Sequence, residues 1–143
     1  RSQWGKPLKI STVLDTNVAV LKLFPGIATS VLSSVLKTKN LRAVIVQTYG
    51  SGNAPTTKGF LKQLKDAVDK GIILVNVSQC PAGGVNMKAY ATGLELERIG
   101  LVSGYNATFE AILTKLFVLL AKSKNPEQVR KMLQIPYCGE FDL

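Results

Sequence analysis

The chain has 143 residues, 46% of them hydrophobic, and its 18 lysine and arginine residues against 9 acidic residues give a formal net charge of +9. This length and apolar content are typical of one folded domain and exclude a disordered chain. No apolar run approaches the roughly 20 residues that a membrane-spanning helix needs, so we expect no membrane partner. The lack of histidine and the presence of only two cysteines, Cys80 and Cys138, argue against a metal site and a disulfide framework and favour a reducing, cytoplasmic location.

The sequence begins Arg1-Ser2-Gln3-Trp4, with neither an initiator methionine nor the features of a signal peptide. We therefore expect an excised domain or a proteolytic product. Residues 1–17 are interpreted as an N-terminal extension or interdomain linker, and residues 18–143 as a single α/β domain.

Apolar strands alternate with amphipathic helices along residues 18–143. Pro25-Gly26 stops the first strand, Gly71 ends the second helix, and Asn125 and Pro126 suit the N-cap and first position of the last helix. In chain order the pattern predicts a strand at 18–24, a helix at 27–36, a strand at 41–46, a helix from Thr56 or Thr57 to 70, a strand at 72–77, a helix at 92–99, a short strand at 101–102, and helices at 108–121 and 127–133.

Strands that are apolar throughout and alternate with helices indicate a parallel sheet that is covered on both faces. The sequence therefore predicts a single three-layer flavodoxin-like (Rossmann-like) α/β domain, with a small parallel sheet of about four strands and helices on both faces. Lys58, Lys62 and Lys65 recur at helical spacing and are interpreted as a solvated helix face. The chain lacks the arginine cluster and the aromatic platforms of nucleic-acid-binding proteins, so we expect no nucleic-acid partner.

The loop at 47–57 is the most informative candidate site, because ligands of open parallel sheets bind at the carboxyl ends of the strands. Gly50 and Gly52 allow backbone conformations that are closed to other residues, and the Asn53 amide can both donate and accept hydrogen bonds. The loop could bind a small polar molecule or the backbone of another subunit. The alternative is a tight turn in which Asn53 caps its own helix. The pattern is neither a dinucleotide fingerprint nor a P-loop, which gives no indication of a nucleotide cofactor.

Cys80 follows the third predicted strand. The sequence supplies no nearby base or cation to activate its thiol, and the plain interpretation is a small apolar residue that is half-buried.

Residues 41–55, which end in Gln47-Thr48-Tyr49-Gly50-Ser51-Gly52-Asn53-Ala54-Pro55, closely resemble the strand and loop that open the C-terminal domain core of cytoplasmic (type I) L-asparaginases. Further blocks resemble that family in the same order, and the similarity covers most of the chain from about Val20. One block comprises residues 75–80, 84–87 and 90–93, and another comprises residues 108–116. Residues 25–27, 129–131 and 139–140 match the ends of the family domain.

The resemblance implies an enzyme that hydrolyses asparagine to aspartate and ammonia without a cofactor. A larger N-terminal domain would carry the threonine nucleophile, and the smaller domain of a neighbouring subunit would close the site, in a homodimer or homotetramer. Carried over by position, Asn53 would contact the neighbour's substrate. Cys80 falls where bacterial type I enzymes line an allosteric asparagine site. Gln47 replaces an arginine of that site, and Tyr49 is taken as a further pocket-lining residue.

The family's Thr-Gly-Gly-Thr and Gly-Thr-Asp-Thr signatures are absent from the sequence. We therefore expect no catalytic residue in this chain, and we expect the chain alone to be inactive. The family's Asp-Met-Thr entry to the long helix reads Asn106-Ala107-Thr108, in which Asn106 would keep a capping amide. The alternative hypothesis is a stand-alone flavodoxin-like module that binds a small ligand.

Overall fold

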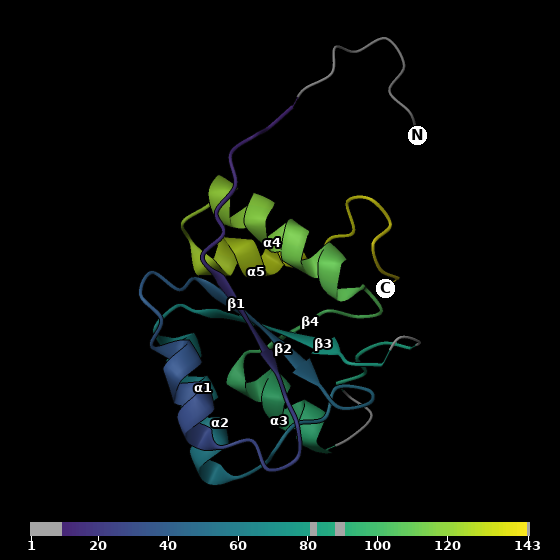
Figure 1. Cartoon of the computed structure of the whole chain (residues 1–143). Helices are drawn as coiled ribbons and strands as arrows, with labels where there is room; N and C mark the ends of the chain where they lie inside the picture. The colour runs from purple at the N-terminus through teal and green to yellow at the C-terminus, as the bar shows by residue number, and fades with distance from the viewer. Residues whose placement is uncertain (1–9, 81–82, 88–90, 143) are drawn as a thin grey trace.

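The computed structural model describes residues 10–80, 83–87 and 91–142. They form a three-layer α/β/α domain built on a four-stranded parallel sheet (Figure 1). The elements are β1 (Val18–Lys22), α1 (Thr29–Leu36), β2 (Ala43–Thr48), α2 (Lys58–Asp69), β3 (Ile73–Ser78), α3 (Ala91–Ile99), β4 (Val102–Ser103), α4 (Phe109–Lys122) and α5 (Pro126–Leu133).

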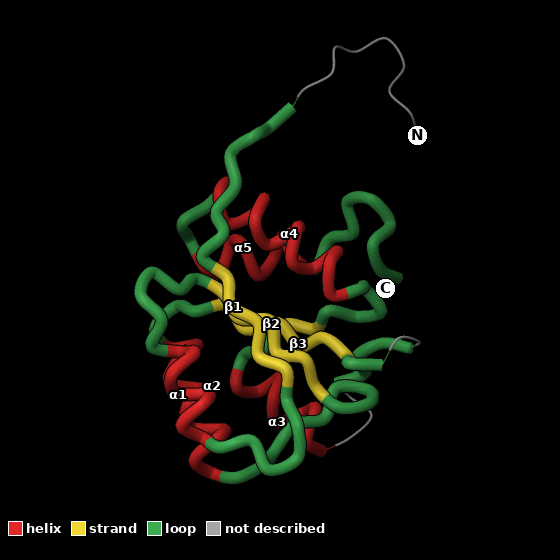
Figure 2. Tube along the Cα trace, in the orientation of Figure 1, coloured by secondary structure: helices red, strands yellow, loops and turns green. Residues whose placement is uncertain are grey.

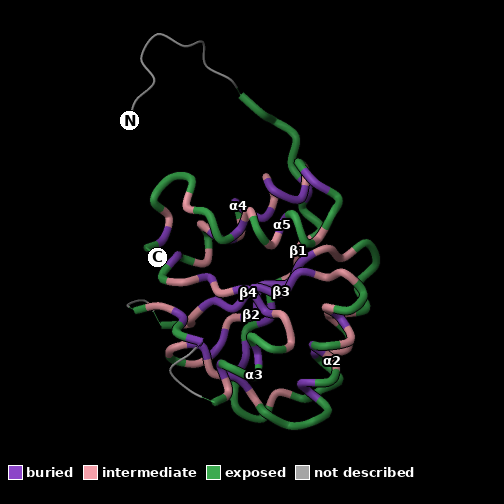
Figure 3. The backbone as a smooth tube through the Cα atoms, turned by 180° about the vertical axis from the view of Figure 1, so that it is seen from behind, coloured by how far each residue is buried: buried purple, intermediate pink, exposed green. Residues whose placement is uncertain are grey.

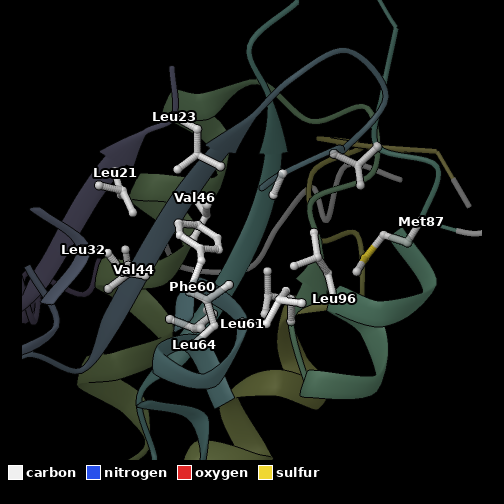
Figure 4. Close-up of a cluster of buried hydrophobic side chains, with 14 residues drawn as sticks. Leu21, Leu23, Leu32, Val44, Val46, Phe60, Leu61, Leu64, Met87 and Leu96 are labelled. Atoms are coloured by element: carbon white, nitrogen blue, oxygen red, sulfur yellow. The ribbon is translucent and has the colours of Figure 1, made fainter. Parts of the chain in front are cut away.

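Two separate cores explain why β2 and β3 are apolar on both faces. Successive residues of a strand point to opposite faces of the sheet. Val44, Val46 and Leu74 pack with side chains of α1, α2 and α3, as Figure 4 shows around Phe60. Residues of the other parity, such as Ile45, pack with side chains of α4 and α5. Figure 3 accordingly shows β2 and β3 as largely buried between helices.

The strand order β1-β2-β3-β4 follows the sequence. Helices α1, α2 and α3 connect successive strands on one face, while α4 and α5 follow β4 and cover the other face (Figures 1 and 2). Right-handed crossovers that always advance in one direction leave their helices on one side of the sheet. The described sheet therefore has no reversal of strand order, the feature at which open α/β sheets form a ligand crevice. Its carboxyl edge instead presents a row of loops.

The prediction of a parallel sheet covered on both faces is confirmed, but the ends of the strands differ. β2 and β3 extend to Thr48 and Ser78, and Gln47 and Thr48 pair with Val77 and Ser78 instead of starting a loop. The first strand ends earlier than predicted, at Lys22. These shifts place Gln47 inside the sheet, and the loop proper begins at Tyr49.

Helix capping differs from the sequence-based expectation at two positions. Asn106 does not cap α4, because Thr108 Oγ1 accepts from Ala111 N at 3.2 Å, while the Asn106 amide binds Asp142. Thr57 occupies the N-cap position of α2 without a side-chain hydrogen bond, so Asn53 does not cap that helix either. At α5 the expected cap is confirmed, with Asn125 Oδ1 accepting from Glu127 N at 2.9 Å.

The segment at 10–17 contains no helix or strand and is fixed by Asp15, whereas residues 1–9 of the predicted linker lie outside the described residues. Arg42 Nη1 donates to Asp15 Oδ2 at 2.8 Å and to Leu120 O at 2.6 Å. The Arg42 guanidinium beside Asp15 holds the pKa of that carboxyl well below its usual range. The Asp15 carboxylate thereby ties the segment to β2 and to the end of α4.

The surface of α2 fits the predicted solvated face, since Lys62 and Lys65 each pair with an aspartate four residues later, Asp66 and Asp69. Both cysteines are free thiols. None of the helices in the described ranges has the length and apolar character needed to cross a membrane.

Candidate functional site

The predicted site residues lie at the carboxyl edge of the sheet. Gln47 is the penultimate residue of β2. Tyr49 and Asn53 lie just beyond that strand, and Cys80 follows β3. The Gln79 side chain joins this edge together, because its Nε2 donates to Leu23 O at 2.7 Å and to Gln47 O at 2.8 Å. The structure therefore brings the ends of three strands together.

Residues 49–53 form a closed turn. Tyr49 N donates to Asn53 O at 2.8 Å, and Asn53 N donates back to Tyr49 O at 2.9 Å. Gly50 and Gly52 have φ angles of 48° and 114°, values that L-residues with a side chain adopt only at a cost. The two predicted glycines are thus the residues that allow the chain to turn back within five residues.

The turn is anchored through its remaining carbonyl groups. Ser78 Oγ donates to Gly50 O at 2.5 Å. The backbone N–H of Asn86 donates to Ser51 O at 2.9 Å. Asn76 Nδ2 donates to Gly52 O at 3.1 Å. Every carbonyl of the turn therefore accepts a hydrogen bond, which fixes the backbone before any ligand is present.

The Asn53 side chain takes no part in the hydrogen bonds that anchor the turn. It is half-buried, and its amide makes no hydrogen bond within the described part of the chain. Among the described residues, the backbone of the turn is therefore fixed while this amide keeps its donor and acceptor groups unused.

The other three predicted residues, Gln47, Tyr49 and Cys80, lie in different environments. The Tyr49 ring packs against the core under α1–α3, and its hydroxyl is buried without a partner among the described residues. The backbone carbonyl of Gln47 is used by Leu23 and Gln79. Cys80 is exposed, so the expectation of a half-buried residue was wrong. It follows β3 where the chain leaves the sheet, and its backbone N–H donates to Ser78 Oγ at 3.0 Å.

Three cavities, of 760, 450 and 150 Å³, are lined by other residues. The first lies along the outer side of β4, the second between α4 and the C-terminal segment, and the third between α1 and α2. The Asn53 turn does not line any of these three cavities. Within the described ranges, no group of three or more His, Cys, Asp or Glu side chains could hold a metal ion.

The sequence motifs do not point to Asn76 or Gln79, although both position the edge. A signal for Asn76 does exist, because it is the one strongly polar residue inside the apolar run at 72–77. Gln79 offers no such signal, since a polar residue after a strand is common.

Comparison with known proteins gives consistent matches. The model of the glutaminase/asparaginase C-terminal domain family matches residues 17–133. L-asparaginase 1 of Escherichia coli (strain K12) is 42% identical over 134 residues, which cover 94% of this chain and 39% of that protein. The 60 kDa lysophospholipase of Mus musculus is 35% identical over 145 residues, covering 100% of this chain and 25% of the relative.

The crystal structure of L-asparaginase I from Vibrio cholerae has a TM-score of 0.89 and 39% identity, and the match covers 97% of this chain and 42% of that one. The chain thus spans about two-fifths of the two L-asparaginases. The matches favour an asparaginase domain over a stand-alone ligand-binding module. They include the turn with Asn53 and both layers of helices, and so the chain belongs to the glutaminase/asparaginase C-terminal domain family.

Proposed function

We propose that residues 18–143 are the C-terminal domain of an L-asparaginase, which hydrolyses L-asparagine to L-aspartate and ammonia without a cofactor. Residues 1–17 would link this domain to an N-terminal domain that supplies the catalytic threonine. Two relatives of this chain are named L-asparaginase, and both are more than twice as long as the part that this chain matches. The additional length leaves room for such a domain.

The observation that carries the proposal is the Asn53 side-chain amide, which has no hydrogen-bond partner among the described residues although the carbonyl groups of its turn are all bonded. An amide can donate to a carboxylate and accept from an ammonium group, and L-asparagine carries both. The turn lies on an open edge, so the rest of the pocket would come from another polypeptide region. We propose that Asn53 contacts the substrate bound by a neighbouring subunit, in a homodimer or homotetramer.

Gln47, Tyr49 and Cys80 lie on the same edge and are proposed to line a second pocket between subunits. The exposure of Cys80 and the half-buried position of Gln47 support a role for both at a contact surface. We further propose a cytoplasmic protein with no nucleic-acid or membrane partner. The absence of a nucleic-acid partner is supported by the charge pattern of α2, because Lys62 and Lys65 are each paired with an aspartate four residues later.

The test is the substitution Asn53→Ala in a protein that joins this chain to its N-terminal domain. Loss of one polar contact to the substrate costs about 1–3 kcal/mol, so we expect kcat/KM for L-asparagine to fall by about ten- to a hundredfold. Ammonia release measures the rate.

The matched control is Asn125→Ala, which also removes an asparagine amide. Asn125 caps α5 at the opposite end of the sheet, beside Gly71. This variant should lose about 1 kcal/mol of stability and keep its turnover. Wild-type kinetics in Asn53→Ala would remove Asn53 from the site.

A further inference from the structure

Asn76 is a polar exception on the face of the sheet that carries α1, α2 and α3. Its same-face neighbours Val46 and Leu74 are fully buried apolar residues, and Asn76 is fully buried as well. Burial removes the hydrogen bonds that a side-chain amide makes with water, so protein groups have to replace them. The partners of this amide therefore indicate what it does.

Both ends of the Asn76 amide are bonded, and together they connect β2 to the turn. Thr48 Oγ1 donates to Asn76 Oδ1 at 2.6 Å, and Asn76 Nδ2 donates to Gly52 O at 3.1 Å. The carbonyl of Gly52 can only accept, so it requires the amide nitrogen on its side. The Thr48 hydroxyl, which also lies 3.3 Å from Val77 O, then donates to the amide oxygen. The nitrogen is then directed at Gly52, the residue that precedes Asn53.

The hydrogen bond from Asn76 differs from the other side-chain anchor of the turn. The bond from Ser78 to Gly50 O is exposed, whereas the bond from Asn76 to Gly52 O is buried. Water competes with an exposed hydrogen bond, and a buried bond in a low-dielectric interior is stronger and more costly to lose. The turn also lies against this amide closely, since a Cβ atom at Gly52 would be 3.1 Å from Asn76 Nδ2.

We propose that Asn76, oriented by Thr48, is a positioning residue that sets where the Asn53 side chain projects. Residue 76 does not touch the substrate and acts only through the turn. This inference rests on the proposed function for its effect on turnover. The placement of the turn, in contrast, can be tested without any enzyme assay.

The first experiment measures amide hydrogen exchange by NMR in the 143-residue chain. In Asn76→Leu and in Thr48→Val we expect the N–H groups of Gly52 and Asn53 to exchange at least tenfold faster than in the wild type, because both donate within the turn. The N–H groups inside β2 should change by less than threefold. Thr48→Ser keeps the hydroxyl and should restore the slow exchange.

Leu74→Ala is the matched control for a general loss of stability. Leu74 is buried on the same strand and the same face as Asn76, but its side chain has no hydrogen bond to lose. This variant should accelerate exchange across the whole sheet without a selective effect on the turn. Unchanged exchange at Gly52 and Asn53 in Asn76→Leu, or the same uniform pattern as in Leu74→Ala, would overturn the proposal.

The second experiment is a double-mutant cycle in the protein that joins this chain to its N-terminal domain. We expect Asn76→Leu alone to lower kcat/KM by about tenfold, and to lower it by less than twofold when Asn53 is already alanine. An equal effect of Asn76→Leu in both backgrounds would show that it does not act through Asn53. Faster exchange of the turn together with wild-type turnover in Asn53→Ala would refute the substrate contact and support the placement of the turn by Asn76.

Discussion

Gly52 is held in a backbone conformation and at a packing distance that both exclude a side chain. Its φ angle is 114°. A Cβ atom at this residue would lie 2.9 Å from Val85 Cγ1 and 3.1 Å from Asn76 Nδ2. Neither neighbour is a flexible chain end, since Val85 is branched and buried and Asn76 is hydrogen-bonded at both ends.

We therefore expect Gly52→Ala to lower the free energy of unfolding of the 143-residue chain by about 1–3 kcal/mol, through backbone strain and overpacking. Urea denaturation followed by circular dichroism measures the change. Gly59→Ala is the control, because Gly59 is an exposed residue of α2 with open space around its Cβ position. That variant should gain up to about 1 kcal/mol from helix propensity. Equal stability changes in the two variants would contradict the role of Gly52.

The residues of this turn illustrate how far the sequence predicts the site. Gly50, Gly52 and Asn53 can be identified because turn chemistry is local and appears directly in the residue types. Asn76 cannot be assigned its partners from the sequence, because they depend on the register in which Val46 faces Asn76. That register is decided by the packing of the whole sheet.

Helix α4 carries a buried cation that closes the C-terminal segment onto the domain. Lys115 Nζ donates to Leu133 O at 2.9 Å and to Ile135 O at 2.6 Å, and it forms an ion pair with Glu140 Oε1 at 2.6 Å. The ring of Phe141 lies 4.5 Å from the same nitrogen. The carbonyl of Leu133 belongs to the end of α5, where a cation is favoured by the helix dipole.

The Glu140 carboxylate is the acidic partner of Lys115. Protonation of Glu140 should therefore weaken the attachment of the C-terminal segment to α4. Burial opposes the charged form of Glu140, but hydrogen bonds from Lys115 and from backbone N–H groups outweigh burial and lower its pKa from 4.5 to about 2. A carboxyl whose pKa is lower in the folded state stabilises the fold above its unfolded-state pKa. That contribution is lost as the pH falls from about 4.5 to about 2.

We expect the free energy of unfolding of the wild-type chain to fall by up to about 3 kcal/mol over this pH range through Glu140 alone. Glu140→Gln should be less stable near neutral pH and should show a smaller pH dependence below about pH 4.5. Glu95→Gln, a substitution at an exposed residue of α3, should leave the wild-type pH dependence in place. Urea denaturation at a series of pH values measures the free energy of unfolding. If this free energy depends on pH in the same way in the wild type and in Glu140→Gln, Glu140 does not contribute to the pH dependence.

The elements themselves follow from the sequence more closely than their ends do. Apolar runs and helical periodicity predict each helix and strand, because both patterns report which side of an element is buried. The extension of β2 through Thr48 is not predicted, since a polar residue at a strand end is equally suited to a loop. Thr48 belongs to the sheet because its hydroxyl is bonded to Asn76 and its backbone is paired with β3.

At the scale of the whole molecule, the described residues anchor one edge of the sheet, and the family's nucleophile signatures are absent from the sequence. Two hydroxyl groups at the carboxyl edge are already used as donors, Thr48 to Asn76 and Ser78 to Gly50 O. Lys115 is buried against carbonyl groups and Glu140. A hydroxyl nucleophile needs an adjacent base to take its proton, and in the described ranges Thr48 and Ser78 donate to amide or carbonyl oxygens instead.

The 143-residue chain alone should therefore release no ammonia from L-asparagine above the uncatalysed rate. The same chain joined to an N-terminal asparaginase domain should show turnover that depends on Asn53. Circular dichroism and a cooperative thermal transition would establish that the isolated chain is folded in this assay, so that its inactivity reflects missing catalytic groups. Turnover by the isolated chain at a rate near that of the joined protein would mean that the nucleophile lies within these 143 residues. That result would refute the proposal that the N-terminal domain supplies the catalytic threonine. We expect the opposite outcome, because in the described part of the chain the carbonyl groups of the turn are already hydrogen-bonded while the Asn53 side-chain amide has no partner.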